Sequence, residues 1–187
     1  PAERTTRALA IRHLCSDAGM TQQQSIPDLY KSTTHACPYL KDRTAANLLV
    51  DPRFEVTPTL YDSLIRTGFR RNGTLYYRPH CPTCLECRSV RISVNDFLPN
   101  RSQKRVKKKN NDVRFELRSP TYSDEHFSLY RRYQSVRHGG DSMDDPDPEK
   151  YQQFLIRSNI DTFLIEMRVQ RRLLGVSVVD HVANGLS

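Results

Sequence analysis

Two runs of alternating apolar residues near the end of this 187-residue chain constrain its fold more than any other feature. Every second side chain between residues 163 and 178 is apolar, apart from a short break at Gln170-Arg171-Arg172. The alternating residues are Phe163, Ile165, Met167 and Val169 before the break, and Leu174, Val176 and Val178 after it. Because successive side chains of a strand point to opposite faces of a sheet, both runs predict strands. The tight turn between them predicts an antiparallel hairpin.

The segment before this hairpin predicts a further strand and two helices. Residues 113–117 alternate between apolar and charged side chains, which is typical of a strand. Ser123 precedes two acidic residues, as at the start of a helix, and Gly139-Gly140 is typical of its end. An acidic loop at residues 141–147 leads to the second predicted helix. The residues at helical spacing are Phe127, Tyr130, Tyr133 and Val136 in the first helix, and Tyr151, Phe154 and Leu155 in the second.

The predicted order of strand, helix, helix, strand and strand resembles the opening half of the GCN5-related acyltransferase fold. In that fold the acyl donor binds at the fourth strand and the helix after it, whereas this sequence stops at Ser187, just past the third strand. We therefore expect an α+β protein with a small N-terminal α+β module. This module is followed by a GCN5-related acyltransferase-like α/β domain that is truncated at its C-terminus.

The first hundred residues are rich in turns and predict the small α+β module. Asn72-Gly73 lies between apolar and aromatic residues and predicts a hairpin. Residues 57–67 predict a short helix with Pro58 in its first turn, and residues 90–94 alternate as a strand does. The expected domains are a leader at 1–25, a cysteine-bearing module at 26–100, a basic linker at 101–112 and a partial acyltransferase-like domain at 113–187.

Positive charge is concentrated in one run. The chain has 29 Lys and Arg against 21 Asp and Glu, a net charge of +8, and residues 101–109 contain no acid. The basic residues of this run are Arg101, Lys104, Arg105, Lys107, Lys108 and Lys109. Such a run is either a solvated linker or a surface that binds phosphates. Arginines between residues 66 and 91 favour RNA or another anion. Phe69, Tyr76 and Tyr77 lie among them and would either stack on bases or form core.

Three cysteines form a candidate metal site. Cys81, Cys84 and Cys87 are spaced C-x2-C-x2-C, a spacing used by tetrahedral zinc sites and by iron–sulfur clusters. Cys37 is the remote candidate for a fourth ligand. The alternative is a set of reduced thiols that pack as small apolar side chains.

The cysteine count and the hydropathy pattern indicate the compartment. The cysteines are odd in number, five, and three of them fall within seven residues. This is a poor disulfide framework, so we expect a reducing compartment such as the cytoplasm. No apolar run approaches the roughly 20 residues that cross a bilayer, which excludes a transmembrane protein and a membrane partner.

Glu166 is the candidate catalytic residue of the second domain. It lies on the strand face opposite Ile165 and Met167, so it becomes a buried acid with a shifted pKa if both faces are covered. Such an acid is a candidate general base. The alternative is a carboxylate that is simply solvated or that forms an ion pair with a neighbour such as Arg168. No nucleophile–base motif such as G-x-S-x-G is present in the sequence.

An ordered series of motifs resembles one family from about residue 26 to the end. The series is His35-Ala36-Cys37-Pro38-Tyr39-Leu40, Val50-Asp51-Pro52, Gly68-Phe69-Arg70-Arg71-Asn72-Gly73, Tyr77-Arg78-Pro79-His80-Cys81, Arg91-Ile92-Ser93-Val94, Asn100-Arg101-Ser102-Gln103-Lys104-Arg105, Tyr130-x-x-Tyr133, Arg137-His138, Phe154-Leu155 and Gly185-Leu186-Ser187. It is similar to the bacterial leucyl-tRNA–protein transferases, also called aspartate/glutamate leucyltransferases. These are relatives of the arginyl-tRNA–protein transferases.

The resemblance implies a reaction and its partners. Leucine would move from leucyl-tRNA to the N-terminal amine of proteins that begin with Asp or Glu, which marks them for N-degron protein degradation. The aminoacyl ester is already activated, so transfer requires positioning and oxyanion stabilisation but no cofactor. The alternatives are arginine as the donated residue and, in another class, a non-enzymatic zinc-binding protein that binds RNA.

The resemblance also implies roles for the candidate residues. The basic run would hold tRNA phosphates, and Glu166 would manage the proton of the amine. Arg70, Arg71 or Arg78 would read the acceptor carboxylate by a two-pronged contact. Relatives of the arginyl branch use cysteines of the first module for an iron–sulfur cluster, which points here to Cys37, Cys81, Cys84 and Cys87 as ligands of a cluster or of zinc.

Overall fold

The computed structural model describes residues 3–4, 26–140 and 144–187. The chain forms two compact units, unit 1 at residues 1–89 and unit 2 at residues 90–187, and each is described by itself. Most of the predicted leader and residues 141–143 of the predicted acidic loop lie outside the described residues. Within the described ranges, every helix is too short or too polar to cross a membrane.

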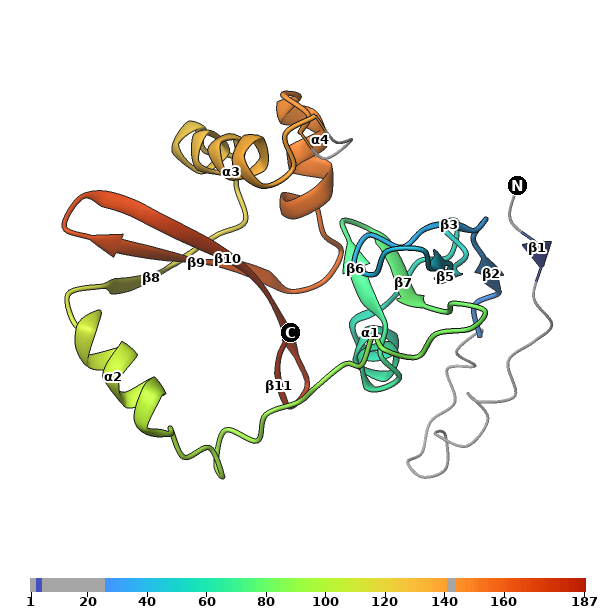
Figure 1. Cartoon of the computed structure of the whole chain (residues 1–187), viewed down its shortest axis with the longest axis horizontal. Coiled ribbons are helices and arrows are strands. Elements are labelled where there is room, and N and C mark those ends of the chain that lie inside the picture. The colour runs from blue at the N-terminus through green and yellow to red at the C-terminus, as the bar shows by residue number, and fades with distance from the viewer. Residues whose placement is uncertain (1–2, 5–25, 141–143) are drawn as a thin grey trace. The chain divides into compact units, whose positions relative to one another are not determined.

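Among its described residues, unit 1 contains a five-stranded antiparallel sheet and one helix (Figure 1). In spatial order the strands are β1 (Glu3–Arg4), β2 (Leu29–Lys31), β5 (Asn47–Val50), β7 (Leu75–Pro79) and β6 (Arg70–Asn72). A separate small hairpin joins β3 (His35–Ala36) to β4 (Thr44–Ala45). The predicted hairpin at Asn72-Gly73 is confirmed as β6–β7, and its turn uses the positive φ of 57° at Gly73.

The predicted helix at residues 57–67 is confirmed as α1 (Pro58–Arg66). Thr57 is its N-cap, and its hydroxyl accepts a hydrogen bond from the Leu60 amide at 3.3 Å. Tyr61 is buried and packs edge-on against Tyr76 of β7, with ring centroids 5.4 Å apart. Tyr76 and Phe69 are therefore core residues of unit 1. For these two of the three aromatic residues, the prediction of a core role is confirmed over stacking on bases.

Unit 2 contains a four-stranded antiparallel sheet (Figure 1). In spatial order its strands are β11 (Gly185–Leu186), β10 (Arg172–Val182), β9 (Thr162–Val169) and β8 (Arg114–Arg118). The predicted hairpin is confirmed as β9–β10, and Gln170 in its turn has a φ of +52°. The predicted strand at 113–117 is confirmed as β8, an edge strand on which Phe115 and Leu117 are exposed.

Helices cover one face of this sheet. They are α3 (Asp124–Arg137), α4 (Pro148–Tyr151) and a π-helix, η2 (Gln152–Ile156), that continues α4. Tyr151, Ile156 and Leu164 form the buried core, with Phe127 and Tyr130 of α3 packed against them. On α3 the buried polar residues are His126 and Gln134, whereas Tyr133 and Val136 are 60% and 89% exposed. Both predicted helices are therefore confirmed, but only Phe127 and Tyr130 of the expected face of the first helix pack against the core.

The segment between the small module and β8 differs from expectation in two ways. Val90, Ile92 and Val94 are 84%, 69% and 86% exposed and form no strand, because no described strand pairs with them. The predicted linker contains a helix, α2 (Arg101–Lys109), which follows a capping box formed by Asn100 and Gln103. No residue of α2 is buried, so capping rather than packing defines it.

Replacing Leu164 with Ala tests the core of unit 2. Leu164 is fully buried on β9, so Leu164→Ala should lower the free energy of unfolding by about 2–5 kcal/mol, measured by urea denaturation. The matched control on the same hairpin is Leu174→Ala, because Leu174 is 44% exposed and should lose less than about 1 kcal/mol. Equal losses for the two variants would contradict this core.

Candidate functional site

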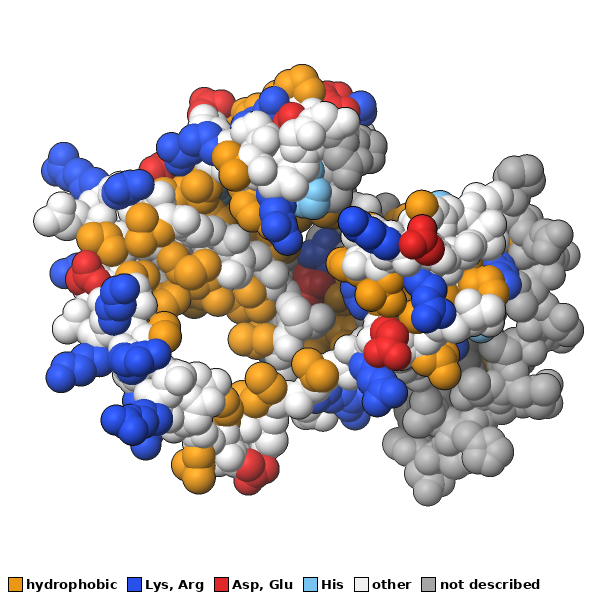
Figure 2. All heavy atoms as spheres, in the orientation of Figure 1, with side chains coloured by type: hydrophobic (Ala, Val, Ile, Leu, Met, Phe, Trp, Pro, Cys, Tyr) orange, Lys and Arg blue, Asp and Glu red, His pale blue; other side chains and the backbone are white. Residues whose placement is uncertain are grey.

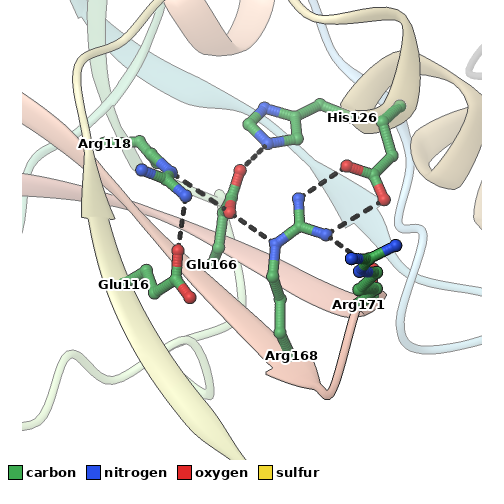
Figure 3. Close-up of polar contacts among 7 residues, drawn as sticks. Glu116, Arg118, His126, Glu166, Arg168 and Arg171 are labelled. Atoms are coloured by element: carbon green, nitrogen blue, oxygen red, sulfur yellow. Dashed lines mark hydrogen bonds and ion pairs between the residues drawn. The ribbon is translucent and has the colours of Figure 1, made fainter.

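The carboxylate of Glu166 lies at the centre of a polar network in unit 2 (Figure 3). Glu166 is in the middle of β9, on the face that carries Leu164, and it is 4% exposed. Its Oε2 accepts hydrogen bonds from Arg168 Nε at 2.7 Å and from Arg118 Nε at 3.2 Å. Its Oε1 lies 2.6 Å from Nε2 of His126. The predicted position of Glu166, opposite Ile165 and Met167, is confirmed, and so is its ion pair with Arg168.

Strand register sets the outer part of this network. Glu116 of β8 pairs directly with Glu166 of β9, so two carboxylates face each other across the ladder. Like charges directly opposite destabilise a sheet. Arg118 lies two residues from Glu116 on the same face and forms ion pairs with both carboxylates (Figure 3). The guanidinium therefore compensates the repulsion that the register creates.

Arg168 connects the sheet to the start of α3. Its Nη1 and Nη2 donate to the two carboxylate oxygens of Glu125 at 3.1 and 2.5 Å, and Nη1 also donates to the carbonyl of Arg171 at 3.1 Å. The neighbouring carboxylates of Glu125 and Glu166 raise the pKa of Arg168 above its ordinary value. The contact with Arg168 lowers the pKa of Glu125.

The network keeps Glu166 charged. Hydrogen bonds from Arg168, His126 and Arg118 outweigh the effect of burial and lower the pKa of Glu166 from 4.5 to about 2. A carboxylate with so low a pKa is a weak proton acceptor near neutral pH. Its surroundings are therefore suited to holding a negative charge in place.

His126 is the buried member of the network. It lies in the first turn of α3 and is 6% exposed. Its second ring nitrogen, Nδ1, is buried and has no hydrogen-bond partner among the residues that the structure describes. The sequence alone does not distinguish His126 from the other titratable residues of this unit, although its helical spacing carries a usable signal. His126, Tyr130 and Gln134 are four residues apart and therefore share one face of the helix.

The three arginines predicted to bind the acceptor are divided between two faces of the unit 1 sheet. Arg70 pairs with Tyr77 and Arg71 with Tyr76, so these consecutive arginines point to opposite faces. Arg71 donates to the carbonyl of Gly73 at 3.3 Å. Arg78 donates to the carbonyl of Thr67 at 3.0 Å, and its guanidinium lies 5.3 Å from the centre of the Phe69 ring.

The four cysteines that the structure describes are not gathered into a metal site. Cys37, Cys81 and Cys84 are half-buried, Cys87 is exposed, and all four are free thiols. The Cys37 sulfur accepts a hydrogen bond from the Leu40 amide at 3.4 Å, and the Cys81 thiol lies 3.8 Å from the carbonyl of Ala46. Across the described ranges, no three or more His, Cys, Asp or Glu side chains are grouped so that they could hold a metal ion. The predicted zinc or iron–sulfur ligand set therefore has no support among the described residues.

The predicted tRNA-binding residues all lie on α2, and all are exposed. Figure 2 shows Lys and Arg side chains gathered over this helix. Lys104 and Arg105 lie three and four residues after Arg101, and four and three residues before Lys108. These four residues therefore share one side of the helix, where they line a groove. Lys107 and Lys109 do not line this groove.

Comparisons with known proteins match both units. Residues 35–105 match the family described as "Arginine-tRNA-protein transferase, N terminus", and residues 125–187 match the corresponding C terminus. The chain is 41% identical over 158 residues to the aspartate/glutamate leucyltransferase of Hahella chejuensis, which covers 84% of this chain and 68% of the relative. The enzymes of the same name from Methylobacillus flagellatus and Nitrosococcus oceani are 42% and 44% identical, over 64% and 68% of their lengths. The chain thus spans about two thirds of the length of the curated relatives it matches.

Replacing Glu166 with Gln tests the charge of the network. The pKa of Glu166 is lower in the folded protein, so its stabilising effect is present above pH 4.5 and is lost as the pH falls towards 2. Glu166→Gln should lower the free energy of unfolding by roughly 2–3 kcal/mol at pH 7. The difference from the unmodified protein should shrink between pH 4.5 and 2, measured by urea denaturation at each pH.

Glu149→Gln is the control for this substitution. Glu149 forms an ion pair with Arg157 in which both side chains are about half exposed, so its loss should change stability by no more than about 0.5 kcal/mol. A loss for Glu166→Gln that stays constant across the acidic range would show that the carboxylate charge is not what stabilises the network.

Proposed function

The chain belongs to the family of the aspartate/glutamate leucyltransferases and arginine-tRNA-protein transferases, and on that premise we propose that it transfers leucine from leucyl-tRNA to proteins that begin with Asp or Glu. The observation that carries the proposal is the identity of about 40%, over 84% of the chain, to relatives that bear the leucyltransferase name. The product would enter N-degron protein degradation.

The chemistry of this transfer suits the residues of unit 2. The α-amine of the acceptor attacks the aminoacyl ester, and the ribose oxygen of the tRNA leaves. The ester is already activated, so the protein has to orient the two substrates and stabilise the tetrahedral oxyanion, without a nucleophile or a cofactor of its own. The chain order of β8, α3, α4, β9 and β10 supports our proposal that unit 2 corresponds to the opening half of a GCN5-related acyltransferase fold.

The basic helix is our candidate for tRNA binding. Nine residues contain six positive charges, and the first turn of the helix contains no acidic residue. Four of the six line one groove, which matches a phosphate backbone better than charges on all sides would. We expect Arg101, Lys104, Arg105 and Lys108 to contact phosphates directly, and Lys107 and Lys109 to contribute only through the general positive field.

Among the predicted acceptor-binding arginines, Arg70 is the best placed for a carboxylate. It is exposed, whereas Arg71 and Arg78 are half-buried and donate to backbone carbonyls. A guanidinium that is already held in this way has fewer donors left for a bidentate contact. Arg78, whose guanidinium lies over the Phe69 ring, would instead stabilise the strands that carry Arg70.

Arginine as the donated residue is the second candidate function, because both matching family models carry the arginine-tRNA name. A non-enzymatic zinc-binding RNA-binding protein is less favoured, since the cysteines do not form a ligand group within the described residues.

Transfer of labelled leucine tests the proposal. The full-length protein, supplied with leucyl-tRNA, should label peptides that begin with Asp or Glu, measured by radiolabel on the peptide or by mass spectrometry. A matched peptide that begins with Ala should remain unlabelled, because it offers no carboxylate to a guanidinium. Labelling from arginyl-tRNA but not from leucyl-tRNA would favour the second candidate, and no transfer from either donor would overturn both.

Salt dependence of tRNA binding tests the role of α2. The double variant Lys104→Ala with Lys108→Ala removes two groove-lining charges, so the slope of log affinity against log salt should decrease by about 1.5–2. The matched control is Lys107→Ala with Lys109→Ala, which removes the same charge from residues outside the groove and should change the slope by less than about 0.5. Equal changes would show that only total charge matters.

A further inference from the structure

We propose that Nδ1 of His126 accepts the proton of the attacking amine, and that Glu166 holds the imidazole in the tautomer that allows this. The inference rests on the aminoacyl transfer proposed above and assigns its proton transfer to a named atom. It also gives Glu166 a different part from the one expected from sequence, because the carboxylate positions the base instead of acting as the base.

The contact with Glu166 defines which ring nitrogen of His126 carries hydrogen. A carboxylate is an acceptor only, so the nitrogen 2.6 Å from Glu166 Oε1 must be the donor. That nitrogen is Nε2. In the neutral ring, Nδ1 therefore has a free lone pair, and it is buried without a partner among the described residues.

An unpartnered buried nitrogen is unusual, because burial without a hydrogen bond costs free energy. The other polar groups around Glu166 have hydrogen-bond partners. Both carboxylate oxygens accept at least one hydrogen bond, and Arg168 donates to Glu125, Glu166 and Arg171. The available acceptor on His126 therefore stands out within a network whose other members are bonded, and it points to a partner that the substrate supplies.

The charges of the network are complementary to the positive charge that the amine proton would bring to His126 during the transfer. The carboxylates joined by hydrogen bonds and ion pairs are Glu116, Glu125 and Glu166, and the guanidiniums among them are Arg118 and Arg168. Three negative and two positive charges leave a net charge of −1. One proton taken up at Nδ1 brings the group to zero, so the network stabilises the imidazolium that forms during the reaction.

Glu166 and His126 have the separate roles of a histidine–carboxylate pair. Arg118 and Arg168 bind Oε2 of Glu166 and leave Oε1 to His126 (Figure 3). Because they also keep Glu166 ionised, the amine proton is not lost to the carboxylate. The carboxylate fixes the ring and its tautomer, and the free nitrogen does the proton transfer.

The step balances in atoms and charge. The lone pair of the neutral amine forms a bond to the ester carbonyl carbon, and the resulting N–H proton moves to Nδ1. The bond between that carbon and the ribose oxygen then breaks, and the proton passes from Nδ1 to this oxygen. An amide and a free ribose hydroxyl are produced, and His126 returns to its neutral form.

Shielding of Nδ1 from solvent has two consequences. Water is kept away from the atom that would otherwise activate it, which protects the ester from hydrolysis. The residues that cover Nδ1 must also move when the substrates bind, and this movement is part of the proposal.

His126→Gln separates the chemical role from a structural one. The amide nitrogen of Gln reaches about the position of Nε2 and keeps the hydrogen bond to Glu166, but this side chain has no base. In the full-length protein, His126→Gln should keep the melting temperature and the tRNA affinity, while kcat for leucine transfer falls about 100-fold or more with little change in KM.

The outcomes distinguish failure of the proposed role of His126 from failure of the proposed leucine transfer. An active unmodified enzyme together with an active His126→Gln variant would overturn the role of His126 and leave the proposed function intact. An inactive unmodified enzyme would overturn the proposed function. In that case the nitrogen NMR shifts of the His126 ring still report on the arrangement. They should show hydrogen on Nε2 and a bare Nδ1 in the neutral ring, and the opposite tautomer would overturn the proposal.

Discussion

A carboxylate removed from water is the constraint on which unit 2 depends. Glu166 is 4% exposed, and an ionised group so well buried is costly unless donors replace its lost hydration. The donors come from three elements, β8, β9 and α3, so strand register and helix position are both tied to one side chain. The same requirement explains why Arg168 reaches Glu125 at the start of α3. In this unit, compensation of the Glu166 charge therefore requires a particular strand register and a particular position of α3.

Unit 1 depends on the alternation of its strands more than on buried charge. The buried row on one face of its sheet includes Tyr76, which packs on Tyr61 of α1. That same alternation separates Arg70 from Arg71 and leaves Arg70 exposed. Of the three arginines, Arg70 thus presents an exposed guanidinium, whereas Arg71 and Arg78 donate hydrogen bonds to backbone carbonyls.

Local patterns in the sequence predict the elements but not their partners. The β9–β10 hairpin, α1 and α3 are recognisable because their signals act within a few residues: alternation, Pro58 in the first turn of α1, and Gly139-Gly140 after α3. The Glu166 network is not, since Arg118 and Glu166 are 48 residues apart and only the pairing of β8 with β9 joins them. Residues 90–94 show the same limit, because alternation indicates a strand without saying that a neighbour exists. Cysteine spacing likewise brings three thiols near one another in sequence without supplying a fourth ligand.

The capping box of α2 has a consequence for the energetics of recognition. A nine-residue helix that buries none of its side chains is shorter than the roughly 12–15 residues that sustain helicity in isolation, and its cationic side chains repel one another. Asn100 and Gln103 supply local hydrogen bonds at its start, but burial against the other described residues contributes nothing. An anionic ligand that neutralises the groove would also shift the helix–coil equilibrium, so part of the binding free energy is spent on ordering this segment.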